Sequence, residues 1–210
     1  MKNVFKSWSM SIAFAGIGIL ATGCASGVKN PSGVGVTVMK ADEQGFVAGT
    51  GIESQDLVRV ADKMARGILS IPQIAAAQPA PSVVLEPVIN ETRFPINKDI
   101  FLTRIRVQLN SQAAGKVRFL ARERMATLER ERELKRGGQV TSSSDPNVQE
   151  FKGANFFLTG KLSSLTTRTS GGTSDYVLYS FQLIDARTSD IVWEGYDEIK
   201  KQGIVDAVYR

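Results

Sequence analysis

Three stretches of alternating apolar and polar residues follow one another in the last third of the chain. They cover residues 156–165, 176–184 and 191–199, and short turns at 171–172 and 185–190 separate them. Alternation with a period of two is typical of strands that bury one face. Strands joined by such short turns must run antiparallel. The sequence therefore predicts a C-terminal antiparallel β-meander.

An amphipathic helix is predicted upstream, where apolar residues recur at helical spacing after a possible N-cap at Ser54 and before Pro72. The apolar set is Leu57, Val60, Ala61, Met64 and Ile68. A β-branched run at 82–86 then predicts a strand buried on both faces.

A second helix and a second strand are predicted after that buried strand. Asn97 is placed to cap a helix that ends near Gly115, and residues 116–120 read as a short strand. The helical stripe is Ile100, Phe101, Arg104, Ile105, Gln108 and Leu109. The prediction is one α+β domain: a β-α-β unit with a right-handed crossover, the meander, and helices packed on the sheet.

The amino end carries the features of an export signal. Lys2 and Lys6 precede an uncharged apolar stretch over 10–20, which is too short to span a bilayer as a lasting helix. Small residues then lead to Cys24, the only cysteine. The run Leu20-Ala21-Thr22-Gly23-Cys24 resembles the lipobox of bacterial lipoproteins, with Ala21 where leucine is usual. That resemblance implies a lipid-modified Cys24, and Ala25 after it points to the outer membrane.

The pattern divides the chain into three parts. We expect a signal peptide at 1–23, a lipidated cysteine and flexible tether at 24–52, and a globular domain at 53–210. The tether is rich in Gly, Ser, Val and Thr and shows no sustained period. Acyl chains on Cys24 would hold the protein to a membrane almost irreversibly.

Composition excludes several kinds of chemistry. The chain has no histidine and one cysteine, which removes histidine acid–base catalysis, the usual zinc sites and an internal disulfide. Loss of Lys2 and Lys6 lowers the formal net charge from +5 to +3, which gives no argument for nucleic acid. Four aspartates at 175, 185, 190 and 197 have no metal-binding spacing and are interpreted as turn residues. We expect no catalytic residue, metal or cofactor.

A binding role is therefore the preferred interpretation, with Tyr176, Tyr179 and Arg187 as candidate partner-binding residues. The alternative is that these are ordinary strand and turn residues. Trp193 is interpreted as a core residue rather than a ligand-stacking group. The charged segment 122–136 reads as a solvated helix face, with a partner surface as the less favoured alternative.

Several motifs together resemble those of one known family. They are Phe157-Leu-Thr-Gly-Lys-Leu-Ser-Ser-Leu165, Gly171-Gly172, 176–184, Asp185, Ile191-Val-Trp193, Asn97-Lys98, Arg104-Ile-Arg106, Glu131-Arg-Glu-Leu-Lys135 and Asp206-Ala-Val-Tyr-Arg210. With these motifs the chain resembles the LpoB family of penicillin-binding-protein activators. The likeness covers about 53–210 and the lipobox.

The resemblance implies an outer-membrane lipoprotein with a domain similar to the TolB N-terminal domain. It also implies that the domain docks on the small regulatory domain of a bifunctional class A penicillin-binding protein. Docking is expected to stimulate glycan polymerisation and peptide cross-linking by that partner. We expect a monomer. The tether here is short beside the long proline-rich tether known in the family. The alternative functions are a structural lipoprotein subunit of an envelope or secretion assembly, and an envelope hydrolase.

Overall fold

The structure is a computed structural model that describes residues 30, 32–33, 35–113, 115–141 and 151–204. The predicted signal peptide 1–23, Cys24, most of the predicted polar loop 141–147 and the ending 206–210 lie outside these residues.

The centre of the fold is one mixed sheet of six strands. The strands are β1 (Ser82–Leu85), β2 (Ile89–Glu91), β3 (Arg118–Phe119), β4 (Phe156–Thr169), β5 (Gly172–Asp185) and β6 (Ile191–Gly203). The order is β3-β1-β4-β5-β6, and β2 pairs with β4 farther along the same edge as β1. This α+β arrangement is the predicted fold class.

The meander and the β-α-β unit are both confirmed. β4, β5 and β6 pair antiparallel, with Leu158 opposite Leu183 and Leu183 opposite Trp193. β1 pairs parallel with β3, and the helix α3 (Asp99–Gln112) lies between them in sequence. β2 was not predicted; its three residues follow β1 and pair parallel with β4.

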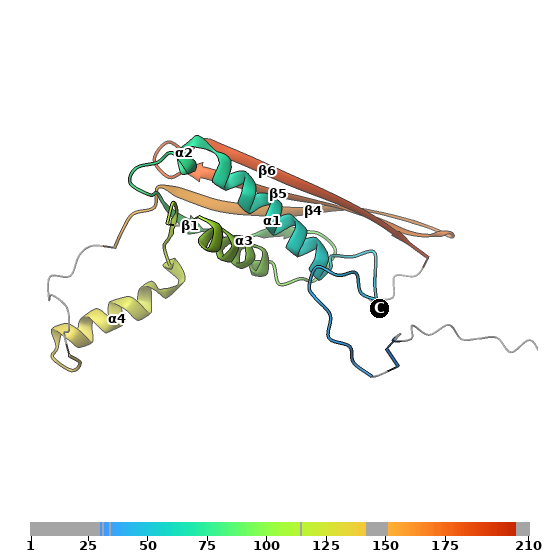
Figure 1. The fold of residues 1–210 in the computed structure, drawn as a ribbon, viewed down its shortest axis with the longest axis horizontal. Coiled ribbons are helices and arrows are strands. Elements are labelled where there is room, and N and C mark those ends of the chain that lie inside the picture. Colours follow the sequence, from blue (N-terminus) through green and yellow to red (C-terminus); the bar gives the residue numbers. More distant parts are fainter. Residues whose placement is uncertain (1–29, 31, 34, 114, 142–150, 205–210) are drawn as a thin grey trace, which may run out of the picture.

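Two helices cover one face of the sheet (Figure 1). They are α1 (Ser54–Ser70) and α3, and they also pack on each other. The short helix α2 (Pro72–Ala75) follows α1, with Pro72 as its first residue. The N-cap of α1 is Glu53 rather than the predicted Ser54, because Glu53 and Asp56 form a reciprocal capping box.

The core lies between these helices and the sheet. Odd-numbered side chains of β5 from 177 to 183 point into it, and Tyr179 and Phe181 are fully buried there. Phe101 of α3 lies 5.6 Å from Tyr179, measured between ring centroids. Trp193 packs against the same core, as predicted, and Gly195 leaves room for its ring, since a Cβ there would lie 2.3 Å from it.

Two aspartates are buried on this helix-covered side and are ion-paired. Asp175 accepts hydrogen bonds from Nε and Nη2 of Arg93 at 3.0 and 2.6 Å. Asp197 accepts from Arg59 Nε at 3.0 Å and from Lys63 Nζ at 2.9 Å. The interpretation as turn residues is therefore wrong for Asp175 and Asp197, whose partners come from distant parts of the chain.

The other two aspartates do belong to a turn. The Asp185 carboxylate accepts hydrogen bonds from the backbone N–H groups of Arg187 and Thr188 at 2.8 and 3.1 Å. Asp190 accepts a hydrogen bond from the Thr188 hydroxyl at 2.7 Å. Together they shape the β5–β6 turn, as predicted.

The segment just before α1 is attached to the end of β6. Lys201 Nζ donates hydrogen bonds to the carbonyl of Gly51 at 2.9 Å and to Asp56 at 2.6 Å. The backbone N–H of Gly49 donates to the Glu53 carboxylate at 2.6 Å, and Thr50 is buried. The last residues of the predicted tether thus contact the domain near the end of β6 (Figure 1).

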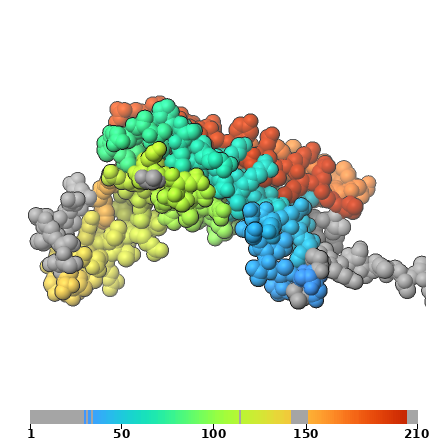
Figure 2. All heavy atoms as spheres, in the orientation of Figure 1, coloured from blue at the N-terminus to red at the C-terminus, as the bar shows by residue number. Residues whose placement is uncertain are grey.

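A charged helix completes the fold. The 3-10 turn η1 (Arg122–Arg124) leads into α4 (Met125–Arg136), which ends at Gly137. No residue of α4 is buried, and it projects from the rest of the molecule (Figure 2). The predicted pair between Glu131 and Lys135 is present at 3.8 Å.

Candidate protein-binding face

The second face of the sheet is uncovered by any helix within the described residues (Figure 1). We call it the open face. On β5 it carries the even-numbered residues from Tyr176 to Ile184, which are all partly exposed. Each of these residues pairs with one residue of β4, between 157 and 165, and most pair with one of β6, between 194 and 200. The paired side chains lie on the same face of the sheet.

Polar side chains on the open face are bonded in pairs. The Tyr176 hydroxyl donates a hydrogen bond to Glu198 at 2.8 Å, and Gln182 donates to Glu194 at 2.7 Å. Lys161 of β4 forms a 2.8 Å ion pair with Glu91 of β2. The hydrogen bond to Glu198 raises the pKa of Tyr176 above its ordinary value, because the carboxylate favours the protonated phenol.

Large apolar and aromatic side chains lie among these pairs. Leu165 is 67% exposed, Tyr196 is 60% exposed and Ile89 is 54% exposed. Leu178 of β5 lies between β4 and β6, opposite Ser163 and Glu198. A solvated sheet face with exposed aromatic and aliphatic groups and a polar surround has the composition of a protein interface.

The helix-covered side differs in its electrostatics. Burial opposes ionisation of Asp175, but the hydrogen bonds from Arg93 and Thr166 outweigh burial and lower its pKa from 3.8 to about 2. Burial likewise opposes ionisation of Asp197, and the bonds from Lys63 and Arg59 still lower its pKa. These charges are engaged within the domain and hold α1 and the β2–α3 loop to the sheet.

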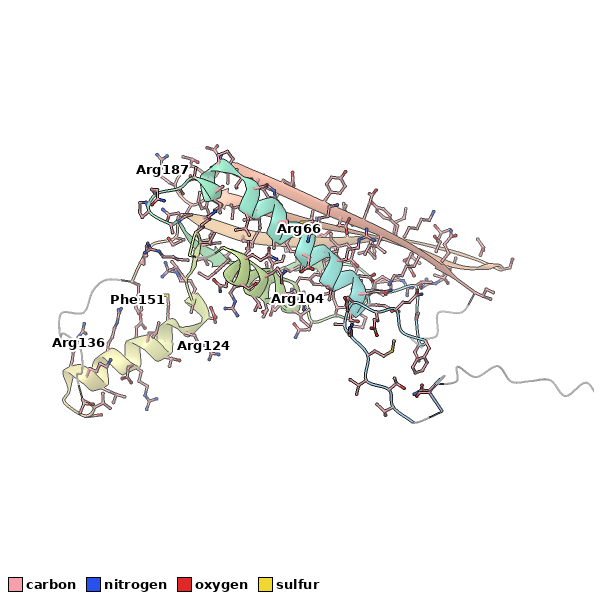
Figure 3. The ribbon with its side chains drawn as sticks, in the orientation of Figure 1. Arg66, Arg104, Arg124, Arg136, Phe151 and Arg187 are labelled. Carbon is pink, nitrogen blue, oxygen red and sulfur yellow. The ribbon has the colours of Figure 1, made fainter. Side chains whose placement is uncertain are left out.

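The structure separates the three predicted partner-binding residues. Tyr176 lies on the open face, as a surface role requires. Tyr179 is 0% exposed and packs against Phe101, so its prediction as a surface contact is corrected: it is a core residue. Arg187 is exposed in the β5–β6 turn (Figure 3). At about 3.3 Å per residue, that turn lies about 30 Å from Tyr176 along β5.

Sequence reasoning missed Tyr196, the most exposed aromatic side chain of the open face. The signal was present in the alternation of the last strand. Tyr196 sits between Glu194 and Glu198 at a spacing of two, and this places all three on one face of β6.

Neither a metal-binding cluster nor a membrane-spanning helix is found in the described part of the chain. No group of three or more Asp, Glu or Cys residues there is placed to hold a metal ion. The described helices include none that is both long and apolar enough to cross a membrane.

Comparison with known proteins gives a family and several structural relatives. A search of curated proteins finds no match. Among solved structures, the C-terminal domain of LpoB from Salmonella enterica is 14% identical, with 70% of this chain and 99% of that chain covered and a TM-score of 0.43. The NMR structure of E. coli LpoB is 12% identical over 95% and 94% of the two chains, with a TM-score of 0.39. Lipoprotein GNA1162 from Neisseria meningitidis is 18% identical over 58% and 83%, with a TM-score of 0.36.

The family assignment comes from the sequence. The model of the family described as "Peptidoglycan-synthase activator LpoB" matches residues 56–199, which is more than half of the chain. The match runs from the first turn of α1 into β6, and so includes β1 to β5 and most of β6. Its members are regulatory activators and not enzymes, in agreement with the prediction of a protein without a catalytic site. This chain belongs to the peptidoglycan-synthase activator LpoB family.

Proposed function

We propose that this protein is an outer-membrane lipoprotein that binds the regulatory domain of a bifunctional class A penicillin-binding protein and activates it. Membership of the activator family is the observation that carries the proposal. The open face supports it, because its exposed tyrosines and aliphatic groups are suited to contact another protein.

The anchor belongs to the same proposal. Lipid on Cys24 holds the amino end at the periplasmic face of the outer membrane, and the domain acts as a monomer at the end of its tether. Each buried CH₂ of an acyl chain contributes about 0.8 kcal/mol, so two or three chains give lasting attachment.

Activation needs no chemistry from this chain. A synthase that exchanges between less active and more active conformations shifts towards the second if the activator binds it more tightly. The stimulation is limited by the ratio of the activator's affinities for the two conformations of the synthase. A tenfold ratio corresponds to a difference of about 1.4 kcal/mol in binding free energy. Contacts of the open face with only one conformation would supply that difference.

The test uses the full-length lipoprotein in detergent and a purified class A synthase from the same organism. We expect saturable binding and faster glycan polymerisation in the presence of the lipoprotein. Variants Tyr196→Ala and Tyr176→Phe should weaken both effects, whereas Lys40→Ala, which changes an exposed residue far from the sheet, should not. Neither binding nor stimulation by the wild-type protein would refute the proposed function.

A further inference from the structure

A groove of about 260 Å³ lies at the carboxyl ends of the parallel strands β1 and β3, beside the first turns of α3. Ligands of α/β sheets commonly bind outside the carboxyl ends of parallel strands. This groove is on the helix-covered side of the sheet, since Leu85 in its lining pairs with Leu158, whose side chain belongs to the core. It is therefore separate from the open face.

The floor of the groove is apolar. Leu85 and Phe119 pack against the core from the two strands, and Leu102 of α3 is almost fully buried. The volume of the groove is below the roughly 300–1,000 Å³ of typical small-molecule pockets. The groove is therefore of a size for one long side chain with an apolar stem, and too small for a helix.

Carboxylates stand around this floor. Glu86 follows β1, Asp99 begins α3 and Glu123 belongs to η1. Glu86 and Asp99 are exposed, and neither forms an ion pair or a side-chain hydrogen bond with another residue of the described chain. With these three carboxylates and the guanidinium of Arg106, the lining has a formal charge of −2 in a chain whose net charge is +5. We call this site the acidic groove.

The wall formed by η1 is fixed on both sides. Arg106 of α3 pairs with Glu123 at 3.6 Å, and both side chains are partly exposed. Arg122 Nη2 donates a hydrogen bond to the carbonyl of Lys152 at 2.7 Å, which ties η1 to the segment that leads into β4. Arg106 is thus engaged with one carboxylate of the groove, and it leaves Glu86 and Asp99 for a ligand.

We propose that the acidic groove receives an arginine side chain from a basic segment of the synthase. This inference rests on the proposed function and adds a contact separate from the open face. Charge complementarity identifies the occupant, because an arginine combines an apolar stem for the floor with a cation for Glu86 and Asp99. Its planar guanidinium can bond a carboxylate through two N–H groups and lie on the ring of Phe119.

The spacing of the carboxylates favours this extended cation over a metal ion. Among the residues that the structure describes, no three acidic groups are placed to hold a metal. Carboxylates that stand apart around an apolar floor suit a cation with several N–H donors, which can bond more than one of them.

The experiment measures the affinity of the full-length lipoprotein in detergent for the purified class A synthase. In the variant Thr103→Arg, the new arginine lies one helical turn after Asp99, where it can enter the groove and pair with its carboxylates. The variant thus fills the site with a tethered copy of the proposed ligand. The control Asn110→Arg adds the same charge at an exposed position about 10 Å farther along α3.

A second pair of variants removes charge instead of adding it. Glu86→Gln/Asp99→Asn neutralises the two carboxylates that have no partner in the described chain, with little change in shape. The control Glu129→Gln/Glu133→Gln removes the same charge from exposed positions on α4. Thermal unfolding monitored by circular dichroism checks that all four variants are folded.

We expect both groove variants to lower the affinity by about 10- to 100-fold at low salt, and both controls by less than about threefold. The effect of Glu86→Gln/Asp99→Asn should shrink at 0.5 M salt, because exposed charges are then screened. Thr103→Arg should keep its effect at high salt, since its side chain also occupies the apolar floor.

Three outcomes would overturn the inference. Equal losses in the groove variants and their controls would mean that only net charge matters. Wild-type affinity in both groove variants would remove the groove from the interface and leave the proposed function standing. A dimer of the lipoprotein alone that Thr103→Arg dissociates, without an effect on the synthase, would assign the groove to a second copy of this chain. Wild-type protein that does not bind the synthase at all would instead refute the proposed function, and the inference with it.

Discussion

The body of the domain and the projecting helix α4 are stabilised in different ways. In the body, α1, α3 and the sheet share one core, and the three buried aspartates, Asp56, Asp175 and Asp197, are ion-paired with arginine or lysine. In α4 no side chain is buried, and a hydrogen bond and a cation–π contact hold it in place. Substitutions in the core of the body should therefore change stability, whereas substitutions in α4 should have little effect on unfolding.

The largest effect is expected in the core. Phe181→Ala removes a fully buried ring that packs beside Phe101 and over Gly160, and should cost about 3–5 kcal/mol of unfolding free energy. Chemical denaturation, monitored by circular dichroism, measures this loss of unfolding free energy. A loss below about 1 kcal/mol would mean that this part of the core is not tightly packed.

A buried carboxylate should give the next largest effect. Asp175→Asn replaces the charged hydrogen bonds between Asp175 and Arg93 by neutral ones at a buried site, and should cost about 2–4 kcal/mol at neutral pH. The pKa of Asp175 is lowered from 3.8 to about 2 in the folded state. Its contribution is therefore complete above pH 3.8 and is lost as the pH falls towards 2. Urea midpoints between pH 5 and pH 2 should fall less steeply for the variant than for the wild type.

The open face should affect binding and not folding. Tyr196→Ala should reduce affinity for the synthase by about 1–2 kcal/mol, because an exposed aromatic group is a typical interface anchor. Its unfolding free energy should change by less than about 0.5 kcal/mol. Thr188→Ala in the β5–β6 turn serves as a surface control. A large loss of stability in Tyr196→Ala would place Tyr196 with the core instead.

The smallest effect on stability is expected in α4. Phe151→Ala removes the ring under Arg132 and should change the unfolding free energy of the domain by less than about 0.5 kcal/mol. Hydrogen exchange of the α4 amides should nevertheless become faster, since this contact orders the helix. Unchanged exchange would show that Arg122 alone holds α4.

Local periodicity accounts for most of what could be predicted. The meander and the helices of the β-α-β unit follow from residue spacing, because each buries one face. The same spacing could have placed Tyr179 in the core, since it shares the odd-numbered face with Val177, Phe181 and Leu183. β2 escaped prediction because its three residues, which lie between Pro87 and Pro95, are too few to show a sustained alternation.

Contacts between distant parts of the sequence could not be predicted. Asp175 lies 82 residues from Arg93, and Asp197 lies 138 residues from Arg59. Nothing local distinguishes these aspartates from Asp185 and Asp190, which shape a turn. The exposure of α4 depends in the same way on tertiary structure, because its sequence suits a solvated helix as well as a docked one.

The hydrogen bonds from Lys201 to the Gly51 carbonyl and to Asp56 also determine where a mechanical force on the amino end would enter the domain. Tension on an anchored amino end would reach the sheet at the carboxyl end of β6, through the Gly51 carbonyl and Asp56. Lys201 lies opposite Asp175, and β5 runs from there to Asp185, about 30 Å away at about 3.3 Å per residue. If the amino end is anchored as proposed, the sheet would act as a spacer between this point of attachment and the β5–β6 turn.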